Sequence, residues 1–186
     1  MGSAIRTVVT GTVDGRSTVV HDGQLEPITP AAMPGFEYYK VWGSDSTPVL
    51  PAGGERPSAA NVFPPSFGSR FWLIRFPAAT PAPADGEGTD GAANAEGGED
   101  LLADLAAVLP GLGESMEPDH PGMHVTATVD YVVVLEGAID LELDDGESVR
   151  LERGTTLVQN GTRHAWRSLP DQPCLVAVAM VGAVRG

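Results

Sequence analysis

The sequence predicts an all-β fold, an antiparallel barrel or sandwich that carries one short helix. Short runs of β-branched and aromatic residues recur along the chain with turn residues between them, and from residue 123 onward strands and turns follow each other without interruption. An acidic stretch rich in Gly, Ala and Pro separates two strand-rich parts. Within that stretch, residues 99–109 have leucines at helical spacing, which predicts the helix.

The N-terminal part predicts four strands. Residues 5–13 and 17–20 are β-branched runs on either side of a Gly-containing turn, so we expect a hairpin. Residues 36–42 and 69–76 are aromatic and alternate, as half-buried strands do. Between them, residues 43–68 are rich in Pro, Gly and Ser and are expected to cover the surface without regular structure.

The acidic stretch is expected to be a linker. Residues 78–98 have almost no large apolar side chain, so burial cannot offset the entropy lost on ordering them. The helix at 99–109 has two interpretations. It docks on the barrel or on a partner subunit through its leucines, or it forms only transiently in a disordered arm.

The C-terminal part predicts the densest set of strands. They are expected at 124–135, 138–143, 148–151, 155–158, 164–168 and 174–181. With 186 residues the chain has room for one domain. We divide it into strands and a wrapping loop (1–76), the acidic linker with its helix (77–118) and the core motifs (119–186).

Composition excludes several classes of partner. The chain has 25 acidic and 11 basic residues, a formal net charge of −14, and its arginines are dispersed, so neither nucleic acid nor an anionic membrane surface is expected to bind. No apolar run approaches a membrane helix or a signal peptide, which predicts a cytoplasmic protein. The single cysteine, Cys174, lies in an apolar strand pattern and is expected to be buried.

A polar face on one predicted strand marks the candidate site. His124, Thr126, Thr128 and Asp130 share parity, so their side chains point to the same face of the strand. When a sheet closes into a barrel, one face turns inward, and polar groups on it need a ligand, water or metal. We therefore expect these side chains in the barrel interior.

Two motifs in this region resemble those of the cupin superfamily. The first can be written G-x5-H-x-H-x3-4-E-x6-G; here His124 stands at the first histidine, Thr126 at the second, Asp130 at the carboxylate and Gly137 at the final glycine. The second motif, G-x5-P-x-G-x2-H-x3-N, is matched by GTTLVQNGTRHAWRS, with Gln159 in place of the proline and His164 as the histidine. The resemblance covers residues 122–181.

The resemblance implies a double-stranded β-helix, the jelly-roll barrel of cupins, with an N-terminal strand extension. It also implies a divalent metal ion (Fe, Mn, Zn, Ni or Cu) bound by His124, Asp130 and His164, two imidazoles and a carboxylate as in the facial triad of Fe(II) oxygenases. His120 is a further candidate ligand, in place of the missing second histidine. The other interpretation is a polar pocket without metal, in which Asp130 accepts a hydrogen bond from an imidazole.

The resemblance and the alternation along the strands together suggest roles for further residues. Thr126 and Gln159 are expected to line the substrate pocket, and Asp130 and His164 to move protons in catalysis. Tyr131 and Trp166 are expected to pack in the core. Two arginines of the 69–76 strand have opposite parity, so that only one can face the pocket: these are Arg70 and Arg75.

The functional hypothesis is a metal-dependent enzyme that acts on a small oxygenated organic molecule, as a dioxygenase, a decarboxylase or lyase, or an isomerase or dehydratase, including in secondary metabolism. The alternatives are a cupin that binds a small molecule without turnover and a cupin without bound metal. An open jelly roll leaves an unpaired sheet edge, which together with the resemblance predicts a homodimer.

Overall fold

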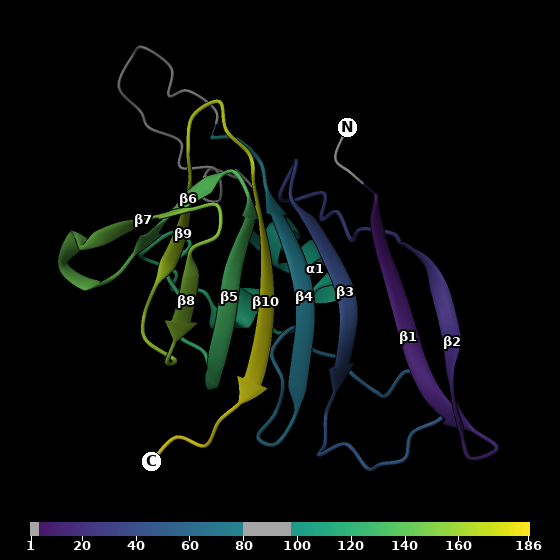
Figure 1. The fold of residues 1–186 in the computed structure, drawn as a ribbon. Coiled ribbons are helices and arrows are strands. Elements are labelled where there is room, and N and C mark those ends of the chain that lie inside the picture. Colours follow the sequence, from purple (N-terminus) through teal and green to yellow (C-terminus); the bar gives the residue numbers. More distant parts are fainter. Residues whose placement is uncertain (1–3, 80–97) are drawn as a thin grey trace.

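The computed structural model describes residues 4–79 and 98–186. Its elements are arranged as two facing antiparallel sheets and a separate hairpin (Figure 1). In chain order they are β1 (Ile5–Val13), β2 (Arg16–Leu25), β3 (Glu37–Ser44), β4 (Ser69–Phe76), α1 (Gly98–Val108), η1 (Gly113–Ser115), β5 (Thr128–Glu136), β6 (Ala138–Glu142), η2 (Asp144–Gly146), β7 (Ser148–Glu152), β8 (Thr156–Gln159), β9 (Ala165–Ser168) and β10 (Cys174–Gly182).

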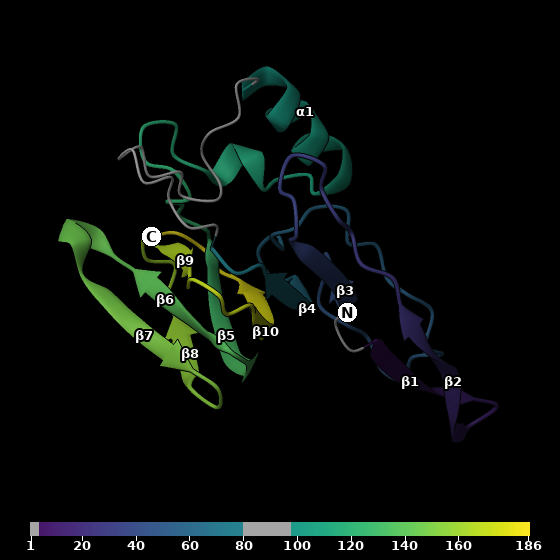
Figure 2. The same ribbon diagram turned by 90° about the horizontal axis from the view of Figure 1, so that it is seen from above.

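The larger sheet has five strands in the order β3-β4-β10-β5-β8, and the smaller has three in the order β7-β6-β9. Seen from above, the two sheets diverge from the end of the larger sheet that carries β5 and β8, and α1 lies across the opening on the side of β3 and β4 (Figure 2). Leu105 of α1, together with Leu109 and Leu112 after it, belongs to the hydrophobic core. The helix therefore closes the barrel and is docked on it, which is the first of the two interpretations given above.

The first hairpin stands apart from the barrel. β1 and β2 pair only with each other among the described strands, and most of β2 is exposed. One backbone hydrogen bond, from Thr12 N–H to the carbonyl of Ala52 (2.8 Å), connects the hairpin to the long loop that precedes β4. Strand β2 extends to Leu25, five residues beyond the predicted end.

Two motif glycines hold tight turns. Gly137, between β5 and β6, has φ +69°, and a Cβ there would lie 2.0 Å from the carbonyl oxygen of Pro173. Gly161, between β8 and β9, has φ +61°, and a Cβ would approach the carbonyl of Thr126 to 2.9 Å. Both positions demand the left-handed backbone and the space that only glycine allows. At both positions the chain passes from the larger sheet to the smaller one, and these tight turns explain why the two motifs have glycine there.

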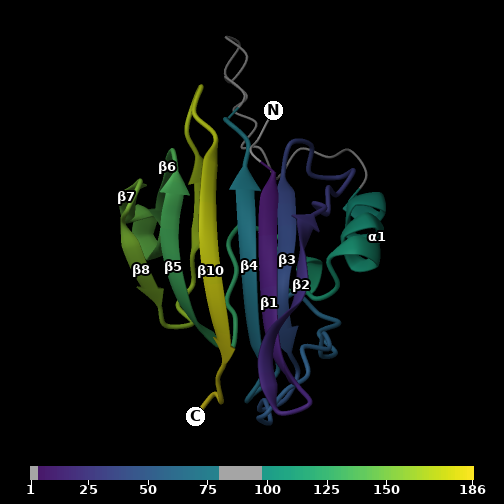
Figure 3. The same ribbon diagram turned by 45° about the vertical axis from the view of Figure 1, so that its right-hand side comes forward.

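The outer face of the larger sheet carries a row of apolar side chains. Val158, Tyr131, Ala179, Phe71 and Trp42 are neighbours in register across β8, β5, β10, β4 and β3, whose order is visible in Figure 3. Exposed fractions of 55% for Val158, 54% for Tyr131 and 43% for Phe71 show that these three side chains of the row are open to solvent, whereas Arg56 lies over the ring of Trp42.

The predicted all-β fold with an N-terminal strand extension and one short helix is confirmed. The helix lies one residue earlier at each end than the leucine spacing predicted. The linker predicted at 78–98 lies mostly outside the described residues. In the part of the chain that the structure describes, no helix is long and apolar enough to cross a membrane. Cys174 is buried, as expected, and burial raises the pKa of its thiol to about 11.

Candidate functional site

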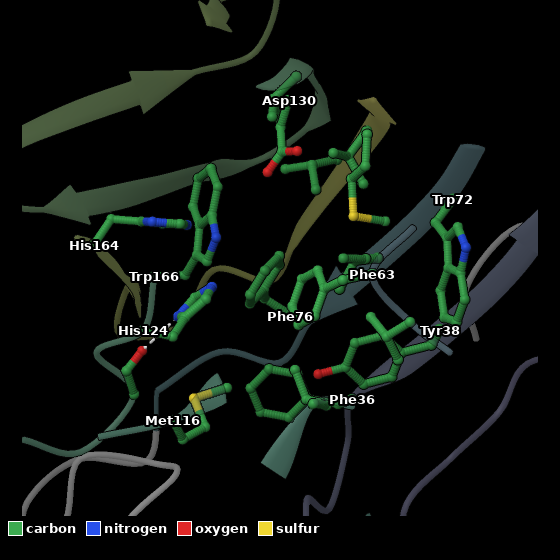
Figure 4. Close-up of a pocket in the computed structure, with 18 of the residues that line it drawn as sticks. Phe36, Tyr38, Phe63, Trp72, Phe76, Met116, His124, Asp130, His164 and Trp166 are labelled. Carbon is green, nitrogen blue, oxygen red and sulfur yellow. Dashed lines mark hydrogen bonds between the residues drawn. The ribbon is translucent and has the colours of Figure 1, made fainter. Parts of the chain in front are cut away.

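A pocket of about 110 Å³ lies between the two sheets (Figure 4). Its wall is mostly apolar and aromatic, and both sheets, the loop after β2 and the segment after α1 contribute to it. The lining consists of Met33, Phe36, Tyr38, Val62, Phe63, Trp72, Ile74, Phe76, Leu112, Met116, Gly122, His124, Asp130, Val132, His164, Trp166, Val176, Val178 and Met180.

Two histidines lie side by side in this wall. His124 and His164 form a β-bridge with reciprocal backbone hydrogen bonds of 3.0 and 3.1 Å, although neither lies in a named strand. Their ring centroids are 4.2 Å apart. The bridge joins the two motifs, so residues forty positions apart in sequence present their imidazoles at one place.

The protonation state of both imidazoles follows from their surroundings. Each is buried, and desolvation lowers the pKa of His124 and lowers that of His164 to about 4, where the neighbouring His124 adds to the effect. Nδ1 of His124 lies 3.0 Å from the carbonyl of Gly122, and Nδ1 of His164 lies 2.9 Å from that of Thr162. A neutral imidazole that donates from Nδ1 has its lone pair on Nε2, which is the ligand form of histidine.

Asp130 is the third polar group in the wall. It lies on β5, is 7% exposed, and its Oδ1 has no hydrogen-bond partner among the described residues. Burial raises the pKa of its carboxyl to about 6, and the Thr128 hydroxyl opposes this to a smaller extent. An unpartnered buried carboxylate oxygen is costly unless a ligand, proton or cation satisfies it.

The three predicted ligands share one pocket but not one cluster. In Figure 4, His124 and His164 lie together at one side and Asp130 stands above them on β5. Within residues 4–79 and 98–186, no group of three or more His, Cys, Asp or Glu side chains is close enough to hold a metal ion. The imidazole pair fits a divalent metal in its chemistry and in its available lone pairs, and Asp130 offers an unsatisfied oxygen in the same pocket.

Comparisons with known proteins match this architecture. No protein-family model matches the chain. Phomopsin biosynthesis cluster proteins C' and D of Diaporthe leptostromiformis are each 54% identical to it over 64 residues, 34% of this chain and 30% of each relative. A cupin-domain-containing oxidoreductase of Neurospora crassa is 39% identical over 44 residues, 24% of this chain and 22% of that protein. The chain has a cupin fold.

The predicted resemblance to the cupin superfamily is thus confirmed. Among solved structures, a polyketide cyclase of Streptomyces resistomycificus is 12% identical and aligns with a TM-score of 0.43 over 87% of this chain and 82% of that one. The matches to the first curated relatives span only 30% of the length of those proteins.

Two residues predicted to line the pocket are not in its lining. Thr126 and Gln159 are both buried, but their polar groups are satisfied locally. The Oγ1 atoms of Thr126 and Thr128 lie 2.8 Å apart, and the Gln159 amide donates to the carbonyl of Thr162 (3.1 Å). The Gln159 bond holds the turn that precedes His164, and the Thr126–Thr128 bond lies at the start of β5, so neither side chain faces the cavity.

The remaining polar candidates also lie elsewhere. His120 is exposed and borders a separate surface depression, so it does not replace the missing imidazole. Arg70 is 2% exposed, but its guanidinium donates to backbone carbonyls and to Asp45 outside the pocket. Arg75 lies on the other face of β4 and pairs with Glu37 and Glu136. Neither arginine faces the pocket.

The expected core packing is wrong for Tyr131, whereas Trp166 packs against the core cluster as expected but also faces the pocket. Tyr131 is 54% exposed because it belongs to the outer face of the larger sheet. Trp166 has the same parity as His164, two residues earlier, and lines the pocket with its ring edge-on to that imidazole at 5.9 Å. The spacing i, i+2 along the strand would have placed Trp166 in the site.

The aromatic part of the wall was missed by sequence reasoning. Phe36, Tyr38, Phe63, Trp72 and Phe76 come from β3, β4 and the adjoining loops, far from both motifs in sequence. Trp72 and Phe76 lie on the same face of β4, and Tyr38 lies on the paired strand β3. The alternation within each strand could have indicated that these side chains are buried. Only the pairing of the strands places them opposite the motif residues.

Proposed function

We propose that this cupin is a metal-dependent enzyme of small-molecule metabolism that acts on a small oxygenated organic molecule bound in the pocket. The observation that carries the proposal is the pair of buried neutral imidazoles, 4.2 Å apart, in an otherwise apolar pocket that also contains an unpartnered carboxylate oxygen. Buried polar groups without protein partners point to a ligand that satisfies them.

A divalent metal ion would be held by His124 and His164 through Nε2, and Fe, Mn, Zn, Ni and Cu all accept such ligands. Asp130 lies in the same pocket but forms no three-donor cluster with this pair in the described residues, so it would become the third donor only by moving toward the ion. When bound, it supplies Lewis-acid polarisation of a substrate oxygen and, for iron, open positions for dioxygen. The carbonyls of Gly122 and Thr162 orient the rings by accepting from Nδ1.

Asp130 is the proposed proton-transfer residue, with His164 as its companion in catalysis. A carboxyl with a pKa of about 6 is partly protonated near neutral pH, so Asp130 can accept or release a proton at Oδ1. The low pKa of His164 keeps Nε2 free of a proton, so in the metal-free site this atom can accept one. The aromatic wall excludes water from this exchange.

Oxidative cleavage, decarboxylation and isomerisation or dehydration are the reaction classes that fit. The local matches to biosynthesis cluster proteins and to a cupin-domain-containing oxidoreductase support a role in secondary metabolism and favour the oxidative class. The alternative is a binding protein without turnover or metal, which is favoured by the presence of two rather than three clustered donors in the described residues.

Metal content tests the proposal. Protein purified without chelators is expected to contain about one divalent ion per chain, and His164→Ala to lose it while remaining folded, because the imidazole is a donor in our assignment. Elemental analysis and circular dichroism are the measurements. His120→Ala, at the exposed histidine, is the matched control and should keep the metal. Equal metal content in all three proteins would reject the site.

A homodimer is also proposed. The exposed row that runs from Val158 through Tyr131 to Phe71, and the solvent-exposed hairpin β1–β2, are candidate contact surfaces, because exposed apolar rows on sheets favour association. Sedimentation that shows a monomer at micromolar concentration would reject it. Location in the cytoplasm and the absence of nucleic-acid partners stay predictions, the second supported by the net charge of −14.

A further inference from the structure

The hydroxyl of Tyr38 is a buried hydrogen-bond donor that lacks a good acceptor among the described residues. Tyr38, on β3, is 6% exposed and lines the pocket. Among the described residues its hydroxyl has one partner, the thioether sulfur of Met33 at 3.9 Å. Sulfur is a weak acceptor, so the donor capacity of this buried group is largely unmet. Burial also raises the pKa of the phenol far above its usual value, which keeps the proton on the oxygen.

Neighbouring rings fix the direction of this hydroxyl. Phe36 stacks on Tyr38 with ring centroids 6.2 Å apart, and Trp72 meets it edge-on at 6.5 Å. In Figure 4 the Tyr38 ring extends from its strand into the group of aromatic side chains, with its oxygen toward Phe36 and away from Asp130. The donor therefore lies at the aromatic part of the pocket, apart from the histidines.

The fold does not account for this hydroxyl. A buried donor with a poor acceptor destabilises the folded chain, and phenylalanine would fill the same space without that cost. Tyr39, the next residue, shows the ordinary solution: its hydroxyl donates to Oε2 of Glu37 at 2.7 Å. Tyr38 has no such acceptor in the described residues, which points to an acceptor that arrives with a ligand.

We propose that Tyr38 is a specificity-determining residue that donates its hydroxyl proton to a neutral carbonyl or ether oxygen on the apolar body of the ligand. The inference rests on the proposed function, that this pocket binds a small oxygenated molecule. It adds a second polar contact at the aromatic part of the wall, so that the ligand is recognised by its oxygen there as well as at the histidines.

Charge and size limit the ligand further. No lysine or arginine is among the residues that line the pocket, so a carboxylate or phosphate at the Tyr38 end would be buried without a counter-charge. The cavity of about 110 Å³ is somewhat smaller than the roughly 150 Å³ cavity that holds benzene in an engineered protein core. The ligand class is therefore a neutral molecule with about one ring or a short branched chain that carries an acceptor oxygen.

A matched pair of probes tests the contact. Cyclohexanone and methylenecyclohexane have the same ring and differ in the carbonyl oxygen. Their dissociation constants are measured by NMR titration of the full chain in three forms: wild type, Tyr38→Phe and, as control, Tyr39→Phe. The ketone is expected to bind Tyr38→Phe about 3- to 10-fold more weakly than wild type, as for loss of one hydrogen bond, whereas the hydrocarbon changes by less than about 2-fold. Tyr39→Phe should alter neither.

The other outcomes separate the two proposals. If both probes bind wild type and Tyr38→Phe weakens them equally, or weakens neither, the donor role is overturned and the pocket stands. If neither probe binds wild type, the small-molecule pocket fails and the donor role with it. Thermal unfolding provides a second readout: Tyr38→Phe should be at least as stable as wild type, and a large loss would mean that the hydroxyl serves the fold.

Discussion

The two ends of the pocket differ in chemistry and in origin. The polar end consists of His124, Asp130 and His164, which the two motifs of residues 122–181 supply. The aromatic end comes from β3, β4 and their loops and contains Tyr38 and Trp72 as its most enclosed rings. The first end carries an unsatisfied carboxylate oxygen, which destabilises the fold, and the second contributes apolar burial that stabilises it but also contains two poorly satisfied donors, the Tyr38 hydroxyl and Trp72 Nε1. Most of the ionisable groups therefore lie at one end of the pocket and most of the stabilising burial at the other.

Trp72→Ala should have the largest effect. Trp72 is 1% exposed and belongs to the core cluster, so its removal leaves a cavity beneath the sheet. We expect the free energy of unfolding to fall by about 3–5 kcal/mol, measured by urea denaturation. Lys40→Ala, which removes the ammonium 5.4 Å above the same ring, is the control and should cost less than about 1 kcal/mol. A loss of less than about 1 kcal/mol for Trp72→Ala would contradict a stabilising aromatic end.

Asp130→Asn should act in the opposite direction, and with a dependence on pH. Burial raises the pKa of Asp130 from 3.8 to about 6, so the folded protein binds a proton more tightly than the unfolded chain does. The contribution to stability is then fully present below pH 3.8 and is lost as the pH rises through about 6. Since Asn does not titrate, the metal-free variant should gain about 3 kcal/mol relative to metal-free wild type between pH 3.5 and pH 8.

Denaturation series at both pH values measure this difference. Asp171→Asn, at an exposed turn with φ +57°, is the matched control because Asn tolerates the same backbone. If Asp130→Asn and wild type keep the same difference in stability at pH 3.5 and pH 8, the carboxyl is not desolvated and the polar end is not under strain.

Tyr131→Ser should have the smallest effect on the barrel. Tyr131 is the residue next to Asp130, but its ring lies on the outer face and is 54% exposed. We expect the free energy of unfolding of the single chain to change by less than about 0.5 kcal/mol. Sedimentation velocity adds a second result: a dimer held by the outer row should dissociate more readily in this variant. A loss above about 2 kcal/mol would mean that Tyr131 packs in the core after all.

Local pattern and the motif resemblance together were enough to predict the polar end, since His164 came from the second motif. Period-two alternation put His124 and Asp130 on the same face, and both are buried in the pocket wall. The same rule applied to Trp166 would have included it, because it lies two residues after His164. Thr126 and Gln159 were harder, since alternation predicts burial and says nothing about whether a neighbouring hydroxyl or carbonyl already satisfies the group.

The aromatic end could not be predicted because it depends on pairing between distant strands. Tyr38 reaches the pocket only because β3 pairs with β4 and β4 with β10. Arg70 illustrates the same limit: its parity was compatible with the pocket, but its guanidinium donates to the carbonyl of Ser44, at the end of β3, and to that of Asn61, in the loop before β4. Alternation in the sequence predicts which side chains share one face of a strand. Which residues lie opposite that face depends on the register between strands of the sheet.

The central position of β10 has a consequence for the order of folding. Its partners β4 and β5 flank it in the sheet, yet β4 ends at Phe76 and β10 begins only at Cys174. Val176, Val178 and Met180 of this strand form the floor of the cavity. Contacts between residues so far apart in sequence form slowly. During synthesis on the ribosome, this wall of the cavity is also missing until residues 174–182 have emerged. A ligand can be enclosed in the pocket only after that late insertion, so the pocket is complete only when the whole barrel has been synthesised.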